Sequence, residues 1–92
     1  MQKRIITIEP GFTLTRITKK AARNVFENGG KVYIYPVYAN PASPWFKGMP
    51  AIQKKYTEYD FDSYVNEFIF YNCNYSELGK YPAYYIQDHE RN

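Results

Sequence analysis

The choice between helix and strand in this chain rests on residues 60–75, which read DFDSYVNEFIFYNCNY. By propensity, residues 68–71 suit a strand. Helical periodicity decides for a helix, because polar side chains lie opposite one broad apolar face. Asp60, or Thr57 before it, can cap the N-terminus of this helix. The predicted core-facing residues are Phe61, Tyr64, Val65, Phe68, Ile69, Tyr71 and Tyr75.

Two residues depart from this helical pattern. Phe70 projects near the centre of the polar face, so either another element covers it or it contacts a partner or a second copy of the chain. Asn72 falls on the apolar face, where its amide would need a hydrogen-bond partner. The simplest interpretation is that the helix ends near Tyr71 and residues 72–74 begin the connection. A buried structural asparagine is the alternative.

A second amphipathic helix is predicted earlier in the chain, between Thr18 as the N-cap and the glycines at positions 29 and 30. At ~100° per residue, its apolar side collects Ala21, Ala22, Val25 and Phe26. Its outer face is mostly basic and holds Lys19, Lys20, Arg23 and Glu27.

Strand-forming segments flank the two helices. Residues 5–15 are rich in β-branched side chains but interrupted at Pro10, which predicts one interrupted strand or two short ones. Residues 31–35 alternate, with Tyr33 and Tyr35 on one face, and should end or become an edge at Pro36. Residues 81–86 predict a last strand whose adjacent tyrosines point to opposite faces.

These elements predict one α+β domain over residues 1–92, with a small sheet of three or four strands and two amphipathic helices on one face. The order helix, glycine turn, tyrosine-rich strand occurs twice, at residues 18–35 and 60–86. The two units do not match in sequence, so the similarity is one of architecture.

Aromatic residues indicate a binding protein rather than an enzyme. The chain has eleven tyrosines, six phenylalanines and one tryptophan among 92 residues. Tyrosine and tryptophan dominate interface hot spots. Residues 40–50 form a proline-rich loop that presents two rings, and such loops often carry binding residues. The predicted partner-binding residues are Tyr33, Tyr35, Trp45, Phe46 and Phe70.

Basic residues suggest nucleic-acid binding as the alternative function. Lys19, Lys20 and Arg23 can neutralise phosphates while exposed tyrosines stack on bases, and a single nucleotide held between tyrosine rings is a smaller version of this idea. The net charge of +3 is too mild to support it alone. A solvated helix face explains the same residues more simply.

Catalytic and metal-binding patterns are weak. Cys73 and His89 are the only cysteine and histidine, and a small buried cysteine with a solvated tail histidine explains them better than a catalytic pair. Asp60 and Asp62 lack further ligands at metal spacing, so helix capping and dipole stabilisation account for both. We therefore predict no enzyme activity, no cofactor and no metal.

The chain contains no apolar run of the ~20 residues that a membrane helix needs, and its N-terminal apolar stretch is too short for a signal peptide. A single cysteine agrees with a reducing compartment. We therefore expect no membrane association and a cytoplasmic location.

Several segments resemble small uncharacterised proteins carried by phages and mobile elements of Gram-positive bacteria. The resemblance is carried by ITKKAA (residues 17–22), residues 35–45, FDSYVNEF (61–68), YNCN (71–74), ELGKY (77–81) and YYI (84–86). It implies a compact, non-enzymatic protein specific for one partner, since such families include anti-CRISPR inhibitors of host defence. The partner it implies is a host protein, foremost a defence nuclease complex, and it assigns no site residues.

Overall fold

The computed structural model describes residues 4–73 and 77–87, so Asn74, Tyr75 and His89 lie outside the described residues. It confirms the α+β class. In chain order the elements are β1 (Ile5–Glu9), β2 (Phe12–Ile17), α1 (Lys19–Glu27), β3 (Tyr33–Pro36), the 3-10 helix η1 (Lys54–Tyr56), α2 (Phe61–Phe68), the π-helix η2 (Ile69–Cys73) and β4 (Pro82–Gln87). Within the described residues, no helix is both long and apolar enough to cross a membrane.

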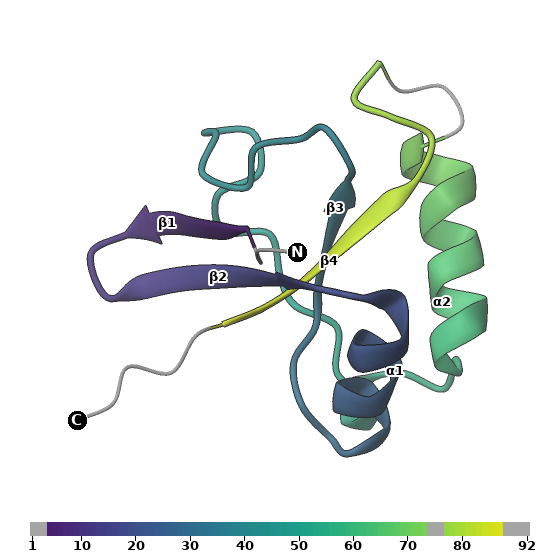
Figure 1. The fold of residues 1–92 in the computed structure, drawn as a ribbon. Coiled ribbons are helices and arrows are strands. Elements are labelled where there is room, and N and C mark those ends of the chain that lie inside the picture. Colours follow the sequence, from purple (N-terminus) through teal and green to yellow (C-terminus); the bar gives the residue numbers. More distant parts are fainter. Residues whose placement is uncertain (1–3, 74–76, 88–92) are drawn as a thin grey trace.

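Four antiparallel strands form one sheet in the order β1-β2-β4-β3 (Figure 1). Residues 5–15 therefore belong to two short strands, separated by a turn in which Gly11 has φ +82°. Such a positive φ favours glycine because it has no Cβ. β3 lies at an edge of the sheet and ends at Pro36, as predicted. Pro82 opens β4, where its missing N–H costs least.

Both helices pack on the same face of the sheet, as the amphipathic patterns predict (Figure 1). The Thr18 hydroxyl accepts from the Ala21 N–H at 3.1 Å and caps α1. The Asp60 carboxylate accepts from the Ser63 N–H at 2.7 Å and caps α2, which also lowers the pKa of Asp60. Between the helices and the sheet lie the buried side chains of Ala22, Phe26, Val32, Ile34, Ile52, Phe61, Val65 and Tyr84.

The opposite face of the sheet is covered by the long loop after β3. Tyr35 meets the Phe46 ring edge-on at 6.0 Å and the Tyr85 ring at 5.7 Å. Tyr33 and Tyr35 share this face, as predicted, but are only 8% and 3% exposed. The expectation that these two tyrosines form a contact surface is therefore wrong. The loop needs an apolar face to pack on, and the two rings provide it.

The end of the second helix differs from the prediction because residues 69–73 form a π-helix. A π-turn contains one more residue than an α-turn, so it changes which side chains face the core. Cys73 is fully buried, while Tyr71 is 71% exposed and Asn72 is exposed. The prediction of a core-facing Tyr71 is therefore wrong. The helical backbone continues to Cys73, two residues beyond Tyr71, and Asn72 is exposed, so the alternative of a buried structural asparagine is wrong.

Burial of tyrosines on both faces of the sheet predicts alkaline unfolding. It raises the pKa of Tyr35 and of Tyr84 to about 12, with smaller contributions from the charges of neighbouring groups. An unfolded tyrosine titrates near pH ~10. The stabilisation is thus complete below pH ~10 and is lost as the pH rises toward ~12. Urea denaturation at increasing pH should show a constant free energy of unfolding up to pH ~9 and a steep fall above ~10.

Tyr84→Phe should flatten this alkaline decline, because the variant lacks one of the shifted phenols. Tyr81→Phe is the matched control, since the Tyr81 side chain is 73% exposed and should leave the pH profile unchanged. Equal profiles for both variants would contradict the assignment of the pH dependence to buried tyrosine.

Candidate functional site

A groove lined mainly by tyrosines runs beside α2 and η2 and has a volume of about 340 Å³. One wall is formed by Tyr64, Glu67, Phe68, Tyr71 and Asn72 of the two helices. Tyr56, Thr57 and Tyr59 form the other wall. We call this set of eight residues the tyrosine groove.

The helical wall of the tyrosine groove follows from residue spacing. Tyr64 and Phe68 are four positions apart and so lie on one side of α2, and the π-turn places Tyr71 in the same wall. The π-helix contributes Tyr71 and Asn72, and π-turns are frequent at functional sites. Phe61 and Val65 beside them on α2 are buried against the sheet, and Tyr64 and Phe68 pack partly against the same core, which holds this wall in place.

The second wall is shaped by local contacts after η1. The Thr57 hydroxyl accepts from the Tyr59 N–H at 3.1 Å, which shapes the turn between the two tyrosines. The Lys55 ammonium lies 5.0 Å from the centre of the Tyr56 ring. Tyr56 and Tyr59 are 76% and 55% exposed. The groove therefore presents large rings that remain open to water.

Phe70 adjoins the tyrosine groove without lining it. Its ring meets the Tyr71 ring edge-on at 4.9 Å, and its side chain is exposed, as its position on the helical wheel predicts. Phe70 therefore supports Tyr71 from outside the groove.

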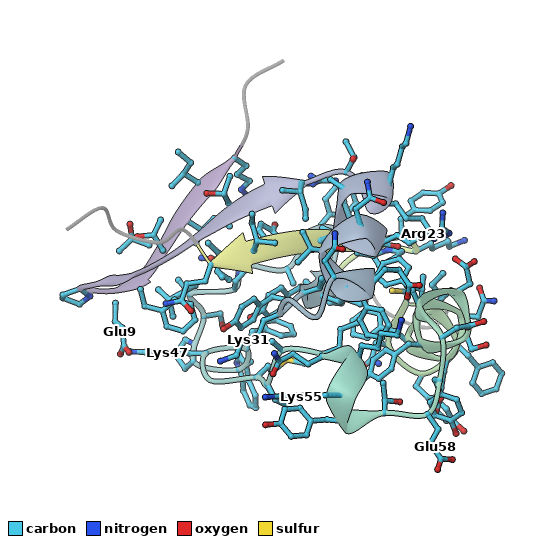
Figure 2. The ribbon with its side chains drawn as sticks, turned by 90° about the horizontal axis from the view of Figure 1, so that it is seen from below. Glu9, Arg23, Lys31, Lys47, Lys55 and Glu58 are labelled. Carbon is cyan, nitrogen blue, oxygen red and sulfur yellow. The ribbon has the colours of Figure 1, made fainter. Side chains whose placement is uncertain are left out.

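One acidic side chain lines the tyrosine groove, and a second is adjacent to its lining residues in sequence. Among the described residues that line it, Glu67 is the one charged side chain. Glu58 lies between Thr57 and Tyr59 in sequence, and Figure 2 shows its side chain pointing away from the fold below α2. An aromatic groove with carboxylates nearby suits a cationic group, which the ring faces and the negative charges both attract.

Arg23 of the predicted basic face joins the two helices. Its guanidinium pairs with the Asp62 carboxylate of α2 and lies 5.7 Å from the centre of the Phe61 ring. These contacts give Arg23 a structural role between the two helices, and its phosphate contact stays a prediction. Lys19 and Lys20 remain exposed on α1.

The two rings of the loop over the sheet, Trp45 and Phe46, have different surroundings. Trp45 is 87% exposed, whereas Phe46 packs inward on Tyr35. Trp45 does not line the tyrosine groove. The five predicted partner-binding residues are therefore not brought together. Tyr33, Tyr35 and Phe46 build the covered face, while Trp45 and Phe70 stay exposed in different places.

Sequence reasoning missed the tyrosine groove. Tyr56 and Tyr59 precede the second helix in a segment without clear periodicity, and the helical period places Tyr71 in the core. The available signal was the close spacing of Tyr56 and Tyr59 around a glutamate, immediately before a helix with tyrosines at positions 64 and 71.

Cys73 is poorly placed for nucleophilic chemistry. Its side chain is fully buried, and burial raises the pKa of the thiol, which disfavours the reactive thiolate. His89, the single histidine of the chain, lies outside the described residues. Within residues 4–73 and 77–87, no three His, Cys, Asp or Glu side chains are grouped as a metal site.

Comparisons with known proteins do not assign a function. No family model matches this chain, and no curated protein or solved structure shows significant similarity to it. Inference about function therefore rests on the surfaces described above.

Proposed function

We propose that this chain is a non-enzymatic binding protein from a phage or mobile element that blocks a partner protein of the bacterial host. The tyrosine groove is the observation that carries this proposal. Four tyrosines line it, and three of them are more than half exposed. Covering such rings releases their hydration water, and tyrosine loses little conformational entropy when it becomes ordered.

The tyrosine groove is a better candidate for the binding surface than the other exposed rings because it is rigidly supported. Trp45 stands on a loop, whereas Tyr64 and Tyr71 stand on a helix anchored by buried Phe61 and Val65. A preorganised surface loses less entropy on binding. The groove is therefore the expected centre of the interface.

The charge around the groove supports a basic surface as the target. An arginine of the partner can stack on the tyrosine rings while its guanidinium pairs with Glu67. Nucleases that bind nucleic acids use lysine and arginine to neutralise phosphates. We propose a defence nuclease complex as the partner, with the chain covering part of its nucleic-acid-binding surface.

Mixing the purified protein with defence nuclease complexes of Gram-positive hosts tests this proposal. We expect the chain to co-elute stoichiometrically with one of them and to reduce its nucleic-acid binding. Because both ligands would occupy the same basic surface, inhibition should weaken as the nucleic-acid concentration rises. Failure to co-elute with any complex, together with no stoichiometric protein recovered from host lysate, would overturn the proposal.

A further inference from the structure

A second groove, with the opposite charge, lies on another side of Tyr56. Its volume is about 580 Å³, and its walls include Phe12, Lys31, Tyr33, Gln53 and Tyr56 together with residues 48–51 of the long loop. We call it the lysine groove. None of its described lining residues is acidic. Tyr56 thus lies between a groove with a carboxylate and a groove with an ammonium group.

Two lysines give the lysine groove uncompensated positive charge. Lys31 lines it, and the Lys55 ammonium lies over the Tyr56 ring. Neither lysine has an ion-pair partner among the described residues.

Neighbouring lysines are neutralised. Lys47 lies 3.6 Å from the Glu9 carboxylate, and Lys54 lies 3.7 Å from that of Glu27. Among these four lysines, Lys31 and Lys55 therefore keep their positive charge without an ion pair within the described residues, with Lys31 in the wall of the groove and Lys55 over its Tyr56 ring.

Aromatic rings accompany this charge. Tyr56 is 76% exposed, and the Phe12 ring packs against Tyr33 at a centroid distance of 5.8 Å. Exposed rings beside lysines are the combination with which proteins hold single-stranded nucleic acids, because every base can stack on a ring and every phosphate attracts an ammonium group. An aliphatic anion would use the lysines and leave the rings unused.

We propose that the lysine groove binds a nucleotide unit, with the base stacked on Tyr56 and the phosphate at Lys31 and Lys55. The unit can be a free nucleotide or part of a single strand, since both offer a base beside a phosphate. This site is separate from the α1 lysines and does not depend on the proposed protein partner.

Fluorescence anisotropy with a labelled oligothymidylate of about eight nucleotides tests the proposal. We expect saturable binding that weakens about sevenfold between ~50 and ~200 mM salt, as two phosphate contacts on a single strand require. Competition with AMP separates the two sources. Displacement by AMP assigns the site to a nucleotide, and displacement by unlabelled oligothymidylate alone assigns it to a single strand.

Charge-reversed variants locate the site. Lys31→Glu combined with Lys55→Glu should abolish most of this affinity. Lys19→Glu combined with Lys20→Glu makes the same change of net charge on α1. This variant should retain most of the affinity. All four lysines are exposed, and circular dichroism checks that both variants fold. Tyr56→Ala, which leaves the charge unchanged, should weaken binding about tenfold through lost stacking.

Three results would overturn the proposal. The first is the absence of a saturable, salt-sensitive signal. The second is an equal or greater loss in the α1 variant, which would move the site to Lys19 and Lys20. The third is displacement by an octaglutamate peptide as effective as displacement by oligothymidylate, which would show that charge alone is recognised. Binding of the protein to a host nuclease is a separate measurement, so either proposal can fail without the other.

Discussion

Replacing Phe26 with alanine is expected to lower the free energy of unfolding by about 4 kcal/mol. Phe26 is fully buried between α1 and the sheet, and its ring contacts the Phe61 ring of α2 at 5.6 Å. The substitution removes apolar contacts shared by both helices and leaves a cavity. Small domains have a total stability of about 5–15 kcal/mol, so this variant should be close to unfolded at 37 °C.

Phe70→Ala is the matched control, because it makes the same chemical change at a side chain that is 56% exposed. We expect a loss below about 1 kcal/mol for this variant, measured by urea denaturation. Comparable losses in the two variants would contradict the packing of α1 on the sheet.

Replacing Tyr71 with alanine is expected to weaken partner binding by about 2 kcal/mol, or about 30-fold. Tyr71 lines the tyrosine groove from η2 and is supported from behind by Phe70. Truncation removes one ring from the helical wall of the groove while leaving the core intact, since the Tyr71 ring is 71% exposed. Affinity for the captured partner, measured by calorimetry or surface plasmon resonance, checks this expectation.

Tyr81→Ala provides the control for this experiment. Tyr81 is 73% exposed, and it lies outside the tyrosine groove. We expect the affinity of the Tyr81→Ala variant for the partner to change less than about threefold. The loss of an aromatic side chain weakens binding strongly only near the centre of an interface. A reversed order, with Tyr81→Ala the weaker binder, would place the interface at the start of β4 instead.

The local charge of the surface differs from the charge of the whole chain. A formal net charge of +3 suggests a mildly basic protein. The fold instead places Glu67 in one groove and Lys31 in another, with Tyr56 lining both. Pairing of Arg23 with Asp62 removes further charge from the α1 face. Binding properties therefore follow from the separation of positive and negative charges into two grooves rather than from the net charge.

Local patterns were sufficient for most of the secondary structure. Thr18 and Asp60 supply cap oxygens, and the 3.6-residue period identifies both helices, because these signals act between residues close in sequence. The alternation in β3 and β4 likewise assigned Tyr84 and Tyr85 to opposite faces of the sheet, as the two buried clusters confirm. The α+β class follows from these elements.

The π-helix marks the limit of such reasoning. A regular α-helix through Tyr71 would bury that ring and leave Asn72 on the apolar face. A π-turn exposes both and buries Cys73 instead. The balance between these geometries depends on how the end of α2 packs against the rest of the fold, and a period measured along the sequence contains no information about that packing.

The amino-acid sequence by itself determined the two helices, the strands and the face on which each tyrosine of a strand lies, because caps, turns and periodicity are local. Only the tertiary structure decided which faces remain open to water. The loop over Tyr33 and Tyr35, and the approach of Tyr56 and Tyr59 to α2, bring together residues far apart in sequence. Exposure depends on such contacts, so both grooves became visible only in the folded chain.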